Sequence, residues 1–164
     1  HRNQARLCLE LSASDFLYFD PNPEQCESGV FSDLTDTEQS FVLHKCNLAI
    51  SDVQGSDHIL TCKKLSINGV KYEMDDIFVI DHVHDEVPVF FKIMKIICFR
   101  SRWLLSGSIY HAVDYSRLLH AYIVSESAIL TVISPGDEKD YHPLDMYSIE
   151  STDYIIMHHK TFVG

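Results

Sequence analysis

From about His58 onward the chain is a succession of short apolar runs, and turn-forming residues separate each run from the next. Apolar runs of about four to eight residues bounded by turn signals are typical of the closely spaced strands of a barrel or sandwich. The spacing of three and four residues that marks a helix is clear only around Tyr110–Leu119 and Pro143–Ile149. We therefore expect an all-β fold, mainly an antiparallel barrel or sandwich, with one or two short helices.

Two stretches predict strands most definitely. Asn68-Gly69 lies between two apolar runs and supplies the positive φ angles of a tight hairpin turn. Val87–Phe99 is apolar at both sets of alternating positions, which indicates burial on both faces or a bulge, so we expect it to be the central strand. In the next run, Arg102–Tyr110, we expect a break at Ser106–Ser108.

The first part of the chain differs in composition from the rest. Residues 1–57 carry ten acidic and three basic residues. Leu7–Leu11 and Phe16–Phe19 are short apolar runs that suit added strands or a docking segment, and Phe41–Cys46 is long enough for one strand. We divide the chain into an acidic, loop-rich segment with short strands, residues 1–57, which packs on a β-rich module, residues 58–164.

The composition is globular, with 46% hydrophobic residues. A membrane-spanning helix needs about 20 apolar residues, and Lys92 and Lys95 interrupt the longest candidate, Val87–Phe99. The net charge of −11 opposes generic attraction to nucleic acids and anionic lipids, because repulsion acts before contact. We expect a basic partner and no membrane.

Five cysteines, an odd number spread along the chain, argue against a complete disulfide framework and fit a reducing compartment. The sequence begins at His1 without a signal-peptide pattern. We therefore expect an intracellular protein and a chain that is a piece of a longer one.

No catalytic or metal motif stands out. His82 and His84 share one face of the predicted strand, but a closed zinc site needs four ligands and there is no Cys-x-x-Cys pair. Cys98 lies in an apolar, core-like run, and no nucleophile signature surrounds it or His120. We expect no catalytic residue, metal or cofactor, and keep a Cys98–His120 hydrolase as the enzymatic alternative.

The charges are distributed unevenly along the chain, and the most informative part is a basic stretch, residues 87–113, which contains no acidic residue. Aromatic residues are interleaved with its cations, as in surfaces that stack on bases and contact phosphates. The alternative is that these cations face solvent and pair with acidic loops. The four cations are Lys92, Lys95, Arg100 and Arg102.

Aromatic side chains beside a carboxylate also form cages for methylated lysine. The candidates are Tyr72, Phe78, Trp103, Tyr110 and Tyr115, and we expect core positions for Phe78 and Trp103.

The run Gly69-Val-Lys-Tyr-Glu-Met-Asp-Asp-Ile-Phe-Val79, followed by Val89–Ile96, the Trp103 strand and Ala121–Val124, resembles bromo-adjacent homology domains. Those modules open with a Tyr, a short gap, an Asp and an apolar strand, and continue with an Ile-x-x-Ile strand. The resemblance covers residues 69–124 and implies a β module of chromatin in the nucleus. It carries over no methyl-lysine cage residue.

The closing stretch, Asp140–Tyr147 followed by Tyr154–His158, resembles the end of an uncharacterised β-rich module of multidomain animal proteins, some of them derived from transposable elements. This resemblance implies a fragment of a larger protein and supplies no activity.

We expect a non-enzymatic interaction module that binds a protein segment, such as a basic histone tail. The alternative is a nucleic-acid-contacting accessory domain of a transposon-derived protein, although the net charge disfavours it. The predicted binding residues are Lys92, Lys95, Arg100, Arg102, Trp103, Tyr72, Tyr110 and Tyr115.

Overall fold

The computed structural model describes residues 26–84, 86–140 and 142–157. The predicted strands Leu7–Leu11 and Phe16–Phe19 lie outside these residues. The strands are β1 (Cys26–Val30), β2 (His58–Cys62), β3 (Lys64–Ile67), β4 (Val70–Glu73), β5 (Ile77–Val83), β6 (Val87–Phe99), β7 (Arg102–Ser116), β8 (Ala121–Ile133), β9 (Asp145–Ile149) and β10 (Thr152–Ile156). The helix is α2 (Asp36–Lys45), and single 3-10 turns span Phe31–Asp33 and Ile50–Asp52.

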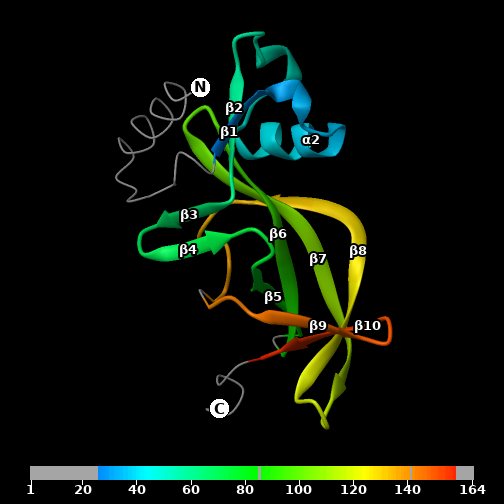
Figure 1. Cartoon of the computed structure of the whole chain (residues 1–164). Helices are drawn as coiled ribbons and strands as arrows, with labels where there is room; N and C mark the ends of the chain where they lie inside the picture. The colour runs from blue at the N-terminus through cyan, green and yellow to red at the C-terminus, as the bar shows by residue number, and fades with distance from the viewer. Residues whose placement is uncertain (1–25, 85, 141, 158–164) are drawn as a thin grey trace.

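The predicted fold class is confirmed: one curled antiparallel sheet dominates the chain (Figure 1). Its strand order is β1-β2-β6-β7-β8-β10-β9, and β5 also pairs with β6. The sheet curls far enough for Leu144, just before β9, to donate its N–H to the carbonyl oxygen of Ile77 in β5 at 2.7 Å. Among the described residues no helix is long and apolar enough to cross a membrane.

β6 is the central strand, as its double-sided apolar pattern predicted. It pairs with β7 along one edge, and β2 and β5 share the other edge. The Asn68-Gly69 hairpin is also confirmed, with φ angles of 51° and 82° at the turn between β3 and β4.

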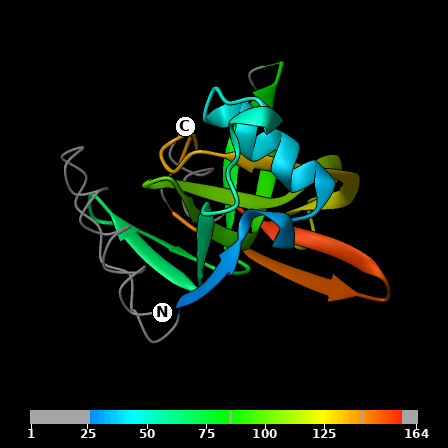
Figure 2. The ribbon, with the colours of Figure 1, turned by 90° about the horizontal axis from the view of Figure 1, so that it is seen from above.

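Two layers cover opposite faces of the sheet (Figures 1 and 2). The β3–β4 hairpin packs Leu65, Ile67 and Tyr72 against one face. Helix α2 packs Val42 and Leu43 against the other. Residues 26–57 thus share the sheet and the core of the β-rich module, because β1 pairs with β2 and α2 covers the sheet. The division at residue 57 stays a prediction.

Several local predictions are wrong. Phe41–Cys46 is not a strand, because a capped helix, α2, runs through it. Tyr110–Leu119 and Pro143–Ile149 are not helical: β7 extends to Ser116 and the second range contains β9. In both ranges strand pairing outweighs the helical spacing of the apolar residues, because each helix would be too short to be stable by itself.

Ser106–Ser108 does not break β7, which is another correction. The pairing register with β6 shifts between Ile93 and Lys95, directly opposite these small residues. A β-bulge bends a strand without ending it. A Cβ on Gly107 would lie 1.9 Å from the carbonyl oxygen of Lys92, so only glycine allows this approach. The small residues therefore help the sheet to curl.

Cys26 and Cys62 occupy directly paired positions of β1 and β2 and form a disulfide. The cysteine count did not predict this bond. Cys46 carries a free thiol at the end of α2, and Cys98 is buried in β6.

Candidate functional site

A hollow of about 540 Å³ lies where three turns meet at one end of the sheet. The first wall is the β3–β4 hairpin with Ile67, Asn68, Val70 and Tyr72. The second is the β6–β7 turn, residues 100–103, and the third is the loop that follows β8, residues 134–136. Four of the eight predicted binding residues line this hollow, namely Tyr72, Arg100, Arg102 and Trp103.

The β6–β7 turn is a two-residue hairpin in which neither residue is glycine. Arg100 and Ser101 both have left-handed φ angles, 47° and 67°, between the paired residues Phe99 and Arg102. A left-handed conformation costs a residue with a Cβ about 1–2 kcal/mol. Such a turn persists because its surroundings fix it.

Arg100 is the residue that fixes the turn. Its Nε and Nη2 donate to the two carboxylate oxygens of Asp57 at 3.0 and 2.7 Å, and Nη2 also donates to the Asp52 carbonyl oxygen at 2.6 Å. The guanidinium lies over the Phe99 ring, 5.4 Å from its centroid. The hydrogen bond from Arg100 lowers the pKa of Asp57. The charge of Arg100 is therefore neutralised within the molecule.

Arg102 differs from Arg100. Its side chain is exposed at the first position of β7. Within the described part of the chain Arg102 has no ion pair and no hydrogen-bond partner for its side chain. Arg102 is paired with Phe99, which packs on the α2 side of the sheet, and its charge acts on the Cys46 thiol on that same side, so the Arg102 side chain lies on the face opposite Trp103.

Tyr72 and Trp103 are the deeply buried members of these walls, only 2% and 3% exposed. The Tyr72 hydroxyl donates to the carboxylate of Glu138, which also accepts the Gly136 N–H at 2.9 Å. Glu138 itself is buried. These bonds tie the loop after β8 to the β3–β4 hairpin, so two walls of the hollow are held in fixed relation.

The other four predicted residues lie elsewhere. Lys92 is half-buried in the middle of β6, opposite Ser108. Tyr110 is buried and donates to Glu126 at 2.9 Å; burial and this carboxylate raise its pKa. Tyr115 packs edge-on against Tyr122, with 4.9 Å between ring centroids.

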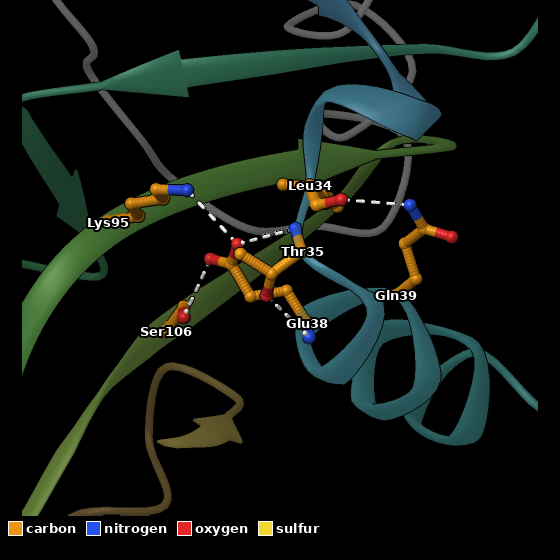
Figure 3. A network of polar contacts seen from close by, with 6 residues as sticks. All are labelled: Leu34, Thr35, Glu38, Gln39, Lys95 and Ser106. Atoms are coloured by element: carbon orange, nitrogen blue, oxygen red, sulfur yellow. Dashed lines mark hydrogen bonds and ion pairs between the residues drawn. The ribbon is translucent and has the colours of Figure 1, made fainter.

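Lys95 belongs to a polar network beneath helix α2 (Figure 3). Its ammonium lies 3.0 Å from the carboxylate of Glu38, which is 1% exposed. Ser106 donates to the other carboxylate oxygen at 3.1 Å, and the Thr35 N–H donates to the first at 3.0 Å. Burial alone would raise the pKa of Glu38, but the hydrogen bonds outweigh it and lower the pKa. The network anchors the helix on the sheet.

The structure separates the residues of the enzymatic alternative. Cys98 is completely buried in β6, whereas His120 is exposed in the turn between β7 and β8. Among the described residues, no group of three His, Cys, Asp or Glu side chains is placed to hold a metal ion. His82 and His84 therefore gain no further ligand there.

Sequence reasoning selected the β6–β7 turn and Tyr72, but not the other residues of the walls that face this turn. Asn68 was predicted only as part of a hairpin turn, and neither the loop 134–136 nor Glu138 was among the predicted binding residues. No local signal connects them, because their proximity depends on the curl of the sheet.

No family model, curated protein or solved structure matches this chain. The resemblances to bromo-adjacent homology domains and to modules of transposon-derived proteins therefore stay predictions.

Proposed function

We propose that this protein is a non-enzymatic interaction module that holds a short segment of a partner protein in the hollow. The observation that carries the proposal is the convergence of Tyr72, Arg100, Arg102 and Trp103 on one concave site from two separate parts of the chain. Ligand sites are typically concave and mostly apolar, with a few placed polar groups. The hollow has this character.

Binding fits the geometry better than catalysis does, because the candidate nucleophile Cys98 is buried away from His120. Nucleic-acid contact fits less well, because the four cations do not form one free basic surface. Lys95 is paired with Glu38 and Arg100 with Asp57. The net charge is −11, so one arginine without an ion pair among the described residues does little to offset the repulsion between the protein and phosphates.

The net charge also bears on the partner. Attraction between opposite net charges speeds the encounter of two proteins. We therefore expect the partner segment to carry basic residues that lie outside the hollow when it is bound. From the resemblance to bromo-adjacent homology domains we propose that this segment belongs to a histone tail in the nucleus. A methyl-lysine cage needs open aromatic faces, and Tyr72, Trp103 and Tyr110 are buried.

The proposal is tested by selecting short displayed peptides against the protein and measuring their binding. Trp103 is the only tryptophan and lines the hollow, so its fluorescence reports directly on occupancy. We expect selected peptides to change this emission, and Val70→Phe, which fills the hollow, to weaken binding at least tenfold.

The matched control is Arg117→Ala, an exposed arginine in the turn between β7 and β8, which should bind normally. Circular dichroism confirms that each variant is folded. The proposed function would be contradicted if the selection enriched no peptide. It would also be contradicted if the selected peptides bound the Val70→Phe variant as tightly as the wild type.

A further inference from the structure

Outside the hollow, a second apolar surface lies on the outward face of β8, β10 and β9. Met146 and Ile155 pack into a buried cluster inside the curled sheet, so the residues that alternate with them point outward. These outward residues surround a shallow depression of about 170 Å³. Its lining, which we call the β9 surface, consists only of aliphatic and aromatic residues: Leu119, Ala121, Tyr147, Ile149, Tyr154 and Ile156.

The β9 surface is open to solvent and is separate from the hollow. Tyr147 and Ile149 are each 49% exposed, and Leu119 is 40% exposed. None of its residues lines the hollow, and Figure 1 shows the β9–β10 hairpin at the other end of the sheet from α2. A contiguous exposed apolar patch commonly marks a contact with another molecule. A depression this small suits one apolar side chain rather than a whole small-molecule ligand.

β9 is also an edge strand of the sheet. It pairs with β10 on one side, and on the other side the Leu144 N–H, just before β9, donates to the Ile77 carbonyl oxygen in β5. Backbone groups alternate in direction along an antiparallel strand, so Met146 and Ser148 direct their N–H and carbonyl groups to the same side as Leu144. Among the described residues no strand pairs with β9 on that side beyond the single bridge at Leu144. β9 can therefore accept a further strand.

The charges around β9 indicate what the occupant is. Residues 145–156, which form β9, β10 and their turn, include Asp145, Glu150 and Asp153 and no basic residue. Arg117, in the turn before Leu119, offsets only one of these charges. A second copy of this chain fits poorly, because a symmetric contact sets a surface against itself and would bring these carboxylates together. A basic segment is the complementary partner.

We propose that the free edge of β9 binds an extended basic segment of a partner protein, which adds a strand to the sheet and lays alternate apolar side chains on the β9 surface. In recognition of this kind the main-chain hydrogen bonds supply affinity, and pockets for alternate side chains supply specificity. Basic residues beside the apolar ones meet Asp145 and Glu150. The inference goes beyond the proposed function, because this second surface does not depend on the hollow.

The test uses a fluorescently labelled peptide, Lys-Thr-Val-Thr-Val-Thr-Lys with both ends blocked, as the probe. In an extended strand its valines and lysines share one face, and the pattern is the same in either direction. Fluorescence anisotropy measures its binding to the whole chain. One control peptide has Glu in place of Lys, and another has N-methyl groups on the three threonines, which removes the N–H groups that would bond to Met146 and Ser148. We expect each control to bind at least about tenfold more weakly than the probe.

The corresponding change in the protein is Ile149→Lys, which removes an apolar contact and adds a charge that repels the probe. We expect it to weaken binding at least about tenfold. Ile129→Lys is the matched control, because Ile129 is an exposed isoleucine of β8 outside the β9 surface, and it should bind the probe normally. Circular dichroism confirms that both variants are folded. Bound probe should also slow hydrogen exchange at the Met146 and Ser148 amides but not at Tyr147, whose N–H faces β10.

The inference would be overturned by absence of probe binding, by equal binding of the probe and either control peptide, or by unchanged binding to Ile149→Lys. A dimer in sedimentation equilibrium that Ile149→Lys dissociates would also overturn it, because a second copy would then occupy the β9 surface. Val70→Phe, which fills the hollow, should leave binding of the probe unchanged, and a loss there would place the probe in the hollow instead. Failure of the hollow and failure of the β9 surface are therefore observed separately.

Discussion

At the residue scale, the buried charges Glu38 and Glu138 each receive several hydrogen bonds, but Asp76 receives less support. Asp76 lies just before β5, and among the described residues its carboxylate accepts one hydrogen bond, from the Glu73 N–H at 3.1 Å. Burial, together with repulsion from Glu73, Asp145 and Asp75, raises its pKa to about 6. A carboxyl group with a raised pKa opposes folding once it ionises, so stability falls as pH rises from about 4 to about 6.

Asp76→Asn should therefore raise the free energy of unfolding at pH 7.5. We expect about 1–2 kcal/mol, below the full value of the pKa shift because the site is partly solvated. The amide can still accept the Glu73 N–H. Urea unfolding at pH 7.5 and pH 3.5 measures the effect, which should vanish at the lower pH.

Asp114→Asn is the matched control, because Asp114 is exposed on β7 and should give no such gain. A gain for Asp76→Asn of equal size at both pH values would show that ionisation of the partly buried Asp76 carboxyl is not its cause.

At the element scale, helix α2 shows how a local signal was overlooked. Thr35 and Glu38 form a capping box, in which the Glu38 N–H donates to the Thr35 hydroxyl at 3.2 Å and the Thr35 N–H donates to the Glu38 carboxylate at 3.0 Å. The apolar residues are adjacent in sequence, Phe41 to Leu43, and this run resembled a strand. The motif at the start of the helix is more diagnostic than the run inside it.

We expect Thr35→Ala to cost about 1 kcal/mol, the usual effect of losing a helix cap. Glu38→Ala should cost more, about 3 kcal/mol, because it also removes the partners of Lys95 and Ser106. Denaturant unfolding at pH 7 measures both. Because folding lowers the pKa of Glu38, this carboxylate contributes fully to the free energy of unfolding above about pH 4.5. The contribution is lost as the pH falls through the lowered pKa.

Thr37→Ala provides the control for these two variants, since Thr37 is exposed inside the same helix. If Thr37→Ala were as destabilising as Thr35→Ala, the capping bond would not explain the loss.

β6 and the Asn68-Gly69 hairpin could be predicted because their information is local: a long apolar run, and a dipeptide that favours positive φ angles. The continuity of β7 through Ser106–Ser108 could not, because it depends on a register shift in the neighbouring strand. The range that contains β9 was mistaken for a helical turn because its apolar spacing suits a helix, although β9 pairs with β10 in a hairpin.

Gly107→Ala tests the close approach of β7 to β6. Since the added methyl group would meet the Lys92 carbonyl oxygen at 1.9 Å, one of two paired strands must shift. We expect a loss of at least about 3 kcal/mol, in the range of severe overpacking. Gly55→Ala is the control, because a Cβ there meets nothing within 4 Å. Thermal unfolding of the two variants should differ clearly, and a similar midpoint for both would contradict the role of Gly107.

At the scale of the whole molecule, the hollow exists because three turns distant in sequence meet at one end of the sheet. The basic stretch pointed to Arg100, Arg102 and Trp103, since local composition is visible in a sequence. Their separation from Lys92 and Lys95 was not visible, because it depends on which faces of β6 are covered. Helix α2 brings Glu38 to Lys95, and the segment before β2 brings Asp57 to Arg100.

The disulfide between Cys26 and Cys62 links β1, and through it the approach to α2, to the rest of the sheet. The two cysteines are 36 residues apart. Closing a loop of this length reduces the entropy of the unfolded chain by an amount worth about 3–4 kcal/mol. Such bonds persist in oxidising compartments, and in a reducing one the same pair would be two thiols.

Replacing both cysteines with Ala should therefore lower the free energy of unfolding by about 3–4 kcal/mol. Hydrogen exchange should increase first in β1 and α2, whereas β6, β7 and β8 should stay protected, because the disulfide constrains only the former edge. Cys46→Ser, which alters a free thiol at the end of α2, is the control and should change neither quantity. Equal exchange throughout the sheet, or unchanged stability of the double variant, would show that the bond does not hold this edge in place.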